Sequence, residues 1–165
     1  MQRNFVAAAV LLSLSVNSLF AADPTMVTLV NQIDPYSPSI VLNPGAEFQD
    51  DARSGAMIIG MDRTPKGRIW GCWTGTGDKK DGYFLLATSD DGGATWSKPR
   101  VAIGARTQNE QKLSGALVGN LWTDPTGRLW LFFDQQLGDA QGRITNWYIR
   151  CDDPDEEEPT WSSPI

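Results

Sequence analysis

Residues 89–96 read SDDGGATW, with two acids and two glycines between two apolar runs. The defined positions of this S-x-D-x-G-x-T-W pattern are Ser89, Asp91, Gly93, Thr95 and Trp96. Serine and aspartate side chains accept hydrogen bonds from nearby backbone N–H groups, and glycine adopts positive φ values. We therefore predict a tight turn tied down by Asp91 and backed by the ring of Trp96. Asp90 is expected to be solvated, so the two acids are not a catalytic pair.

The chain around this turn consists of short apolar runs of strand length, each bounded by Gly, Pro or Asp. The first set is AMIIGM (56–61), RIWGCWT (68–74), YFLLATS (83–89) and WSKPRVAI (96–103). The second set is LVGNLWT (117–123), RLWLFFD (128–134), ITNWYIRC (144–151) and the start of a strand at Thr160–Trp161. This pattern predicts an all-β antiparallel protein.

The two sets are copies of one repeat. GRIW (67–70) matches GRLW (127–130) at a spacing of 60 residues, and SDDGGATWSKP (89–99) matches CDDPDEEEPTWSSP (151–164). A repeat of this length with four strands is typical of propeller blades. We place blade one at about 56–103 and blade two at about 115–165, with Trp70 and Trp130 filling the gaps between blades.

Acidic residues elsewhere are given structural roles. The run DDPDEEE (152–158) lacks the spacing of a calcium loop, so a solvated insertion is expected and no metal site is predicted. Asp124 and Asp134 flank the second GR[IL]W strand and are expected to be turn residues.

The first 22 residues have the order of a secretory signal. Arg3 is followed by an apolar stretch over 5–16 and by Ala21–Ala22, where cleavage after either alanine would leave a mature chain starting near Asp23. Serine and asparagine residues interrupt the stretch, so a membrane anchor is not expected. The sequence thus predicts a secreted or periplasmic protein with a propeller segment over 23–165.

The composition of the chain excludes several classes of partner and of catalytic site. The net charge of −6 argues against nucleic acid as a partner, and the absence of histidine excludes His-based triads and His metal sites within the chain. Cys72 and Cys151 could form at most one disulfide, and unpaired, half-buried thiols are expected. No cofactor is predicted.

The S-x-D-x-G-x-T-W pattern at 89–96 resembles the Asp-box, or bacterial neuraminidase repeat, of the sialidase superfamily. The copy at 151–161 is degenerate, since Cys151 replaces the serine and an acidic insert replaces the glycines. The resemblance covers roughly residues 38–165. It implies a six-bladed propeller of which this chain holds about two blades, as the N-terminal part of a longer protein. It also implies that the Asp-boxes lie on the rim, away from the substrate pocket.

The resemblance also implies a mechanism. Family sialidases use a tyrosine nucleophile polarised by a glutamate, an aspartic acid as acid/base, and three arginines that bind the sugar carboxylate. The tyrosine, its glutamate and the later arginines would come from blades beyond residue 165. The first arginine belongs to an R-I-P motif, and here Met57 and Ile59 occupy its arginine and proline positions. Arg53 is a candidate replacement; the alternative is a solvated loop arginine.

The acid/base position falls in GTGDKKDGYF (75–84), where Asp78 is the candidate and Asp81 the alternative. A charged hairpin tip is the competing interpretation of this loop. The expected function is an exported sialidase-like glycoside hydrolase of the exo-α-sialidase type, truncated and inactive on its own, that acts on a glycan or sialoglycoconjugate. The alternative is a non-catalytic Asp-box propeller that binds extracellular glycans.

Overall fold

The computed structural model describes residues 37–76, 82–104, 107–108, 111–112, 114–137 and 144–165, and residues 33–165 form one compact unit. The expected signal segment, residues 1–22, lies outside the described residues. No helix in the described part of the chain is long and apolar enough to cross a membrane.

The fold is all-β and antiparallel, as predicted, with a first sheet of five strands in the order β1-β5-β4-β3-β2. Its strands are β1 (Ser39–Leu42), β2 (Met57–Arg63), β3 (Ile69–Thr74), β4 (Phe84–Ser89) and β5 (Val101–Gly104). The run at 96–103 becomes a strand only from Val101, because Pro99 has no N–H to donate to a ladder. Strand β1 was not predicted, and it adds an outer edge by pairing with β5.

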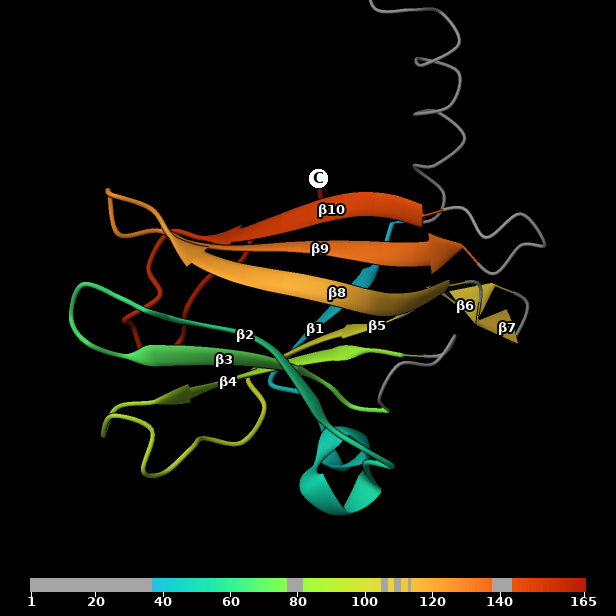
Figure 1. Cartoon of the computed structure of the whole chain (residues 1–165), viewed down its shortest axis with the longest axis horizontal. Helices are drawn as coiled ribbons and strands as arrows, with labels where there is room; N and C mark the ends of the chain where they lie inside the picture. Colours follow the sequence, from blue (N-terminus) through green and yellow to red (C-terminus); the bar gives the residue numbers. More distant parts are fainter. Residues whose placement is uncertain (1–36, 77–81, 105–106, 109–110, 113, 138–143) are drawn as a thin grey trace, which may run out of the picture. The chain divides into compact units, whose positions relative to one another are not determined.

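The second sheet has the order β10-β9-β8 and is formed by β8 (Ser114–Thr123), β9 (Leu129–Leu137) and β10 (Ile144–Cys151). Trp161 adds an isolated bridge to Cys151 at its outer edge. Two short strands, β6 (Thr107–Gln108) and β7 (Gln111–Lys112), form a separate hairpin, and the 3-10 turns η2 (Ala46–Phe48) and η3 (Asp50–Ala52) precede β2. Figure 1 shows the strands β8–β10, in orange to red, above the strands β2–β4, in green.

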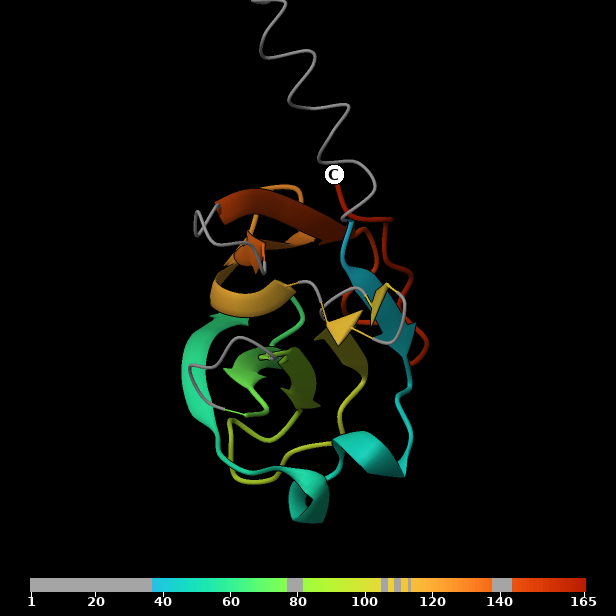
Figure 2. The ribbon, with the colours of Figure 1, turned by 90° about the vertical axis from the view of Figure 1, so that its right-hand side faces the viewer.

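The hydrophobic core lies between the two sheets, where β2 contacts β8. Alternate residues of each strand point into it, as a pleated strand requires. The first sheet contributes Trp70, Cys72, Phe84, Leu86, Val101 and Ile103, and the second contributes Leu121, Leu129, Leu131, Phe133, Ile149 and Cys151. The turned view in Figure 2 shows both sheets along this interface, with β1 beside β5. Packing of neighbouring repeat sheets face to face is consistent with part of a propeller.

The two repeat tryptophans occupy equivalent positions but differ in burial. Trp70 in β3 is fully buried and faces the second sheet, with its ring edge-to-face against Trp161 at a centroid distance of 5.4 Å. Trp130 in β9 alternates with the core residues Leu129 and Leu131, so it points away from the first sheet and is only half-buried. The expectation that both rings fill gaps between sheets therefore holds within this structure for Trp70 alone.

The acidic run 152–158 is not the solvated insertion that the sequence suggested. Its backbone crosses the end of the first sheet, where the Pro154 carbonyl accepts a hydrogen bond from Trp70 Nε1 at 3.0 Å. The Glu156 carbonyl accepts one from Arg68 Nη1 at 2.7 Å, and the Glu157 carbonyl is bonded by Arg100. The insertion thus joins the two sheets through main-chain carbonyls, while most of its acidic side chains remain exposed.

Cys72 and Cys151 are unpaired, as expected, but both are fully buried rather than half-buried. Burial raises the pKa of the Cys72 thiol and raises that of Cys151 to about 12. Both cysteines therefore act as core residues and not as nucleophiles. Asp134 was expected in a turn, but it lies within β9 and pairs with Asn146 in the sheet.

Candidate functional site

Strand register separates the predicted functional residues into two ends of the first sheet. Met57 pairs with Thr74, which pairs with Phe84, so the start of β2 and the β3–β4 connection share one end. Ile69 pairs with Ser89, which places the turn at 89–96 at the opposite end. The first end therefore holds the start of β2, which follows Arg53 in the chain, together with the end of β3 and the start of β4.

The turn at 89–96 is closed by hydrogen bonds within itself. Asp91 Oδ1 accepts from the Thr95 N–H at 2.9 Å and from the Ser89 hydroxyl at 2.8 Å, while Asp91 Oδ2 accepts from the Thr95 hydroxyl at 2.6 Å. Ser89 Oγ accepts from the Gly93 N–H, and Gly92 and Gly93 have φ values of 77° and 96°. These bonds, chiefly from Thr95, hold the pKa of Asp91 well below its usual range.

Asp90 differs from its expected role, because it is paired and not simply solvated. Arg68 donates from Nε to one carboxylate oxygen at 2.7 Å and from Nη2 to the other at 3.1 Å. This bidentate hydrogen bonding lowers the pKa of Asp90 and raises the pKa of Arg68. Both acids of the turn are thus engaged in holding it, and neither has the raised pKa that a general acid needs.

The second copy repeats the geometry of the first with different atoms. Cys151 takes the place of Ser89, with its sulfur 3.4 Å from Asp153 Oδ1. The Thr160 N–H donates to Asp153 at 2.8 Å, and its hydroxyl also bonds the carboxylate. The Thr160 backbone bond is the main reason that the pKa of Asp153 is lowered. The acidic insertion therefore keeps the hydrogen bonds to the aspartate of the turn.

Asp124 is a turn residue, as predicted. Its carboxylate accepts from the backbone and side chain of Thr126, from Arg128 and from Trp130 Nε1. Burial opposes its ionisation, but these donors outweigh burial and hold its pKa below the usual range.

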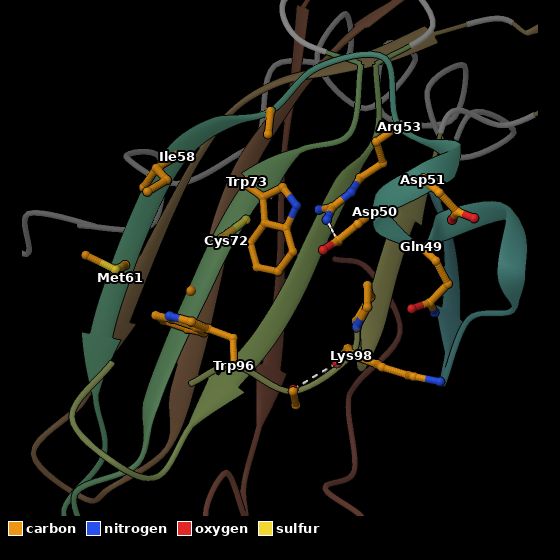
Figure 3. Close-up of a pocket in the computed structure, with 14 residues that line it drawn as sticks. Gln49, Asp50, Asp51, Arg53, Ile58, Met61, Cys72, Trp73, Trp96 and Lys98 are labelled. Atoms are coloured by element: carbon orange, nitrogen blue, oxygen red, sulfur yellow. Dashed lines mark hydrogen bonds and ion pairs between the residues drawn. The ribbon is translucent and has the colours of Figure 1, made fainter. Parts of the chain in front are cut away.

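A cavity of about 670 Å³ opens on the outer side of the first sheet, facing away from the second sheet (Figure 3). One end is polar and includes Gln49, Asp50, Asp51 and Arg53. The rest is largely apolar, with a floor that includes Ile58, Met61, Trp73 and Trp96.

Arg53 is the distinctive group of the polar end. Its side chain is only 12% exposed and lies over the ring of Trp73, with the guanidinium carbon 5.3 Å from the ring centroid. Its ion-pair partner is Asp50, whose side chain is 89% exposed. The Nε1 of Trp73 is buried and has no hydrogen-bond partner among the described residues. A planar cation held against an aromatic ring and neutralised by an exposed carboxylate is suited to exchange that carboxylate for one from a ligand.

The segment before β2 positions this arginine. The 3-10 turn η3 begins at Asp50 and is followed directly by Arg53, so the two side chains can pair. In the preceding turn η2, the ring of Phe48 packs edge-to-face on that of Tyr83, with ring centroids 5.3 Å apart. This contact ties the segment to the β3–β4 connection. Arg53 is therefore not the solvated loop arginine of the alternative interpretation. Met57, which the sequence resemblance aligns with the arginine of the R-I-P motif, is 45% exposed and supplies no charge.

Asp78 and its alternative Asp81 lie outside the described residues. Within the described ranges, no cluster of three or more acidic or cysteine side chains could hold a metal ion. Sequence reasoning missed Trp73 and Asp50. The signal for Trp73 was present in IWGCWT, where it follows Trp70 by three residues and so faces the opposite side of the strand.

Comparisons with known proteins identify the fold. No protein-family model matches this chain, and no curated protein does either. Among solved structures, the chain is similar to the Hadza microbial sialidase Hz136, with a TM-score of 0.57 and 21% sequence identity. The match covers 70% of this chain and 26% of that protein. The chain thus has a sialidase-like all-β fold and spans about a quarter of the sialidase it matches.

Proposed function

We propose that this chain is part of an exported sialidase-like protein that recognises acidic glycans, and that Arg53 binds the sugar carboxylate. The observation that carries the proposal is the placement of Arg53: nearly buried, stacked on Trp73 and neutralised by an exposed Asp50. A ligand carboxylate can replace Asp50 and use both nitrogens of the guanidinium fork. In this proposal the turns at 89–96 and 151–161 are Asp-boxes with a structural role at the opposite end.

Sialoside hydrolysis is the reaction proposed for the whole protein. Asp78 is the candidate acid/base, since it lies in sequence between β3 and β4, and the end of β3 and the start of β4 share the end of the sheet that follows Arg53. The nucleophilic tyrosine, its glutamate and the other arginines would come from outside these 165 residues. We therefore expect that the 165-residue chain does not hydrolyse a fluorogenic sialoside. A protein that includes those groups should hydrolyse it, and the Asp78→Asn variant of that protein should not.

Glycan binding without catalysis is the second candidate, and Met57 favours it. An exposed methionine stands where the family places its first arginine, and it cannot bind a carboxylate. Met57→Arg separates the two candidates in the whole protein. A gain of sialoside binding or turnover supports sialidase ancestry, whereas unchanged binding supports recognition of another acidic glycan.

The direct test measures the affinity of the 165-residue chain for sialyllactose and for lactose by calorimetry or NMR titration. We expect binding of sialyllactose only, with at least tenfold weaker binding by Arg53→Gln. Arg53→Lys keeps the charge but not the fork, so we expect an intermediate affinity. Arg63→Gln, at an exposed arginine in β2, is the matched control and should bind normally. Equal affinity of wild type and Arg53→Gln, or equal binding of lactose, contradicts the proposal.

A further inference from the structure

One backbone position without a side chain adjoins the Arg53 site on the outer face of the first sheet. Alternate residues of a strand share a face, so Trp73 in β3 and Gly75 just after it point to the same side. The Gly75 N–H donates to the Tyr83 carbonyl at 3.0 Å, which continues the β3–β4 ladder past its last residue pair. Tyr83 lies opposite Gly75 in this ladder, so its side chain projects from the same face as Trp73.

Gly75 leaves the space that the ring of Tyr83 occupies. A Cβ added at Gly75 would lie 2.0 Å from Cε2 and 2.1 Å from Cζ of Tyr83, so the ring lies where any other residue would carry its side chain. In this position the Tyr83 ring contacts that of Phe48 edge-to-face, with centroids 5.3 Å apart and an interplanar angle of 86°. The glycine at residue 75 therefore makes the contact with Phe48 possible.

The backbone between Phe48 and Arg53 is a short hydrogen-bonded unit. Within η2 the Phe48 N–H donates to the Gly45 carbonyl at 3.2 Å, and across η3 the Arg53 N–H donates to the Asp50 carbonyl at 3.4 Å. Gln49 joins the two turns, as the residue that ends η2 and precedes η3. None of the residues in these two described turns is buried, so the unit has no core of its own. Phe48 at one end and Arg53 at the other attach it to the sheet.

The two attachments are neighbours on the face of the sheet. Figure 3 shows the side chain of Arg53 beside the ring of Trp73, where the guanidinium carbon is 5.3 Å from the ring centroid. Positions 73 and 75 are about 7 Å apart, since a strand rises about 3.4 Å per residue. A unit that loses its contact at Phe48 can tilt about its other end, and the tilt displaces the guanidinium from the Trp73 ring. The position of the Arg53 cation therefore depends on the aromatic contact five residues earlier.

We propose that Gly75, Tyr83 and Phe48 are positioning residues for the binding of a ligand carboxylate by Arg53. The Tyr83 ring lies across Gly75 and holds Phe48, and the two 3-10 turns fix the guanidinium relative to that contact. The inference rests on the proposed function, because Arg53 is the ligand-binding group in both. It uses only the first sheet and the segment before β2, so it does not depend on parts of the protein outside these residues.

The first measurement needs no ligand. The Arg53 Nε–H signal of the 165-residue chain is followed by NMR and is assigned by its loss in Arg53→Gln. An aromatic ring below the guanidinium shifts this signal upfield, and the low exposure of the side chain slows its exchange with water. Phe48→Ala removes the aromatic contact, and Gly75→Ala displaces the ring of Tyr83. In both variants we expect the signal to move toward that of exposed arginines and to exchange faster.

The second measurement is the affinity of the same variants for sialyllactose. We expect Phe48→Ala and Gly75→Ala each to bind about two- to tenfold more weakly, which is the range that one aromatic pair contributes. Phe48→Leu keeps an apolar side chain against Tyr83 and should recover part of the affinity. Gly104→Ala is the matched glycine control in the same sheet, because its added Cβ would approach only Ser39 Oγ, at an ordinary 3.4 Å. This control should leave both the affinity and the Arg53 signal unchanged.

The outcomes separate this inference from the proposed function. If binding requires Arg53 but Phe48→Ala and Gly75→Ala bind as wild type does, the positioning role is wrong and the proposed function stands. Weaker binding with an unmoved Arg53 signal also contradicts the positioning role, because the aromatic pair then acts on another part of the site. If wild type and Arg53→Gln bind equally, the proposed function is wrong, and the Nε–H signal alone decides whether Phe48 and Gly75 position the arginine. Should Gly75→Ala not fold, Phe48→Ala gives the same decision from a residue outside the strands.

Discussion

Replacing each buried cysteine with serine tests whether the second turn reproduces the first. Cys72 and Cys151 are both fully buried, and both belong to the core between the sheets. Their surroundings differ in one respect. The sulfur of Cys151 lies 3.4 Å from Asp153 Oδ1, in the place where Ser89 donates to Asp91 at 2.8 Å. The side chain of Cys72 packs among apolar residues of β3, β4 and the second sheet.

These surroundings set the size of each effect. Cys72→Ser buries a hydroxyl among apolar neighbours, which costs about 1–3 kcal/mol of unfolding free energy. Cys151→Ser gives the hydroxyl an ionised acceptor already placed for serine, so we expect a change within about 1 kcal/mol of zero. With an m-value of about 2 kcal/mol per molar urea, Cys72→Ser lowers the urea midpoint by about 0.5–1.5 M.

The assay is urea unfolding followed by tryptophan fluorescence and circular dichroism at one protein concentration for all variants. Ser89→Cys is the reciprocal control, and we expect it to be mildly destabilising, because the Gly93 N–H loses its hydroxyl acceptor. If Cys151→Ser is destabilised as much as Cys72→Ser, Cys151 does not take the role of Ser89, and the equivalence of the two turns is wrong.

Two further predictions follow from the hydrogen bonds of the two sheets. Trp70→Phe leaves the Pro154 carbonyl without its 3.0 Å indole donor and should cost about 2–3 kcal/mol. Trp73→Phe removes an Nε1 that has no hydrogen-bond partner within the described part of the chain, so it should cost less than about 1 kcal/mol. Urea midpoints measure both, and equal losses would show that the insertion does not join the sheets. The lowered pKa values of Asp90, Asp91, Asp124 and Asp153 predict acid destabilisation. A carboxylate whose pKa is lower in the folded state stabilises the fold above its unfolded pKa of about 3.9, and this contribution is lost as the pH falls through the folded value. The melting temperature should therefore be level from pH 7 to about 5 and fall below about pH 4, less steeply in Asp91→Asn; a melting temperature that rises on acidification contradicts this assignment.

Local chemistry made much of the fold predictable. Strand-length apolar runs, the repeated GR[IL]W motif and the turn residues of 89–96 identified the strands of both sheets except β1, and also the role of Asp91. The predictions that were wrong concerned residues whose roles depend on contacts with residues distant in the sequence. The ion pair of Asp90 requires Arg68, which lies 22 residues earlier, and the carbonyls of Pro154 and Glu156 find their donors more than 80 residues earlier. No local pattern encodes such contacts.

The candidate site was only partly predictable for the same reason. Arg53 was identified because it lies four residues before Met57, in the strand where the family resemblance predicts an arginine. Its burial depends on Trp73 from the neighbouring strand and on the 3-10 turn that brings Asp50 into contact. A sequence comparison with the family motif points to Met57 and gives no reason to examine Trp73.

The most direct test of the account locates the bound sugar. An NMR titration of the 165-residue chain with N-acetylneuraminic acid would follow the indole N–H signals of the tryptophans, assigned by single Trp→Phe variants. We predict that the Trp73 signal shifts on titration in wild type and in Asp91→Asn, and does not shift in Arg53→Gln. Shifts confined to Trp96 beside the 89–96 turn, with Trp73 unmoved, would contradict the assignment of the glycan site to Arg53.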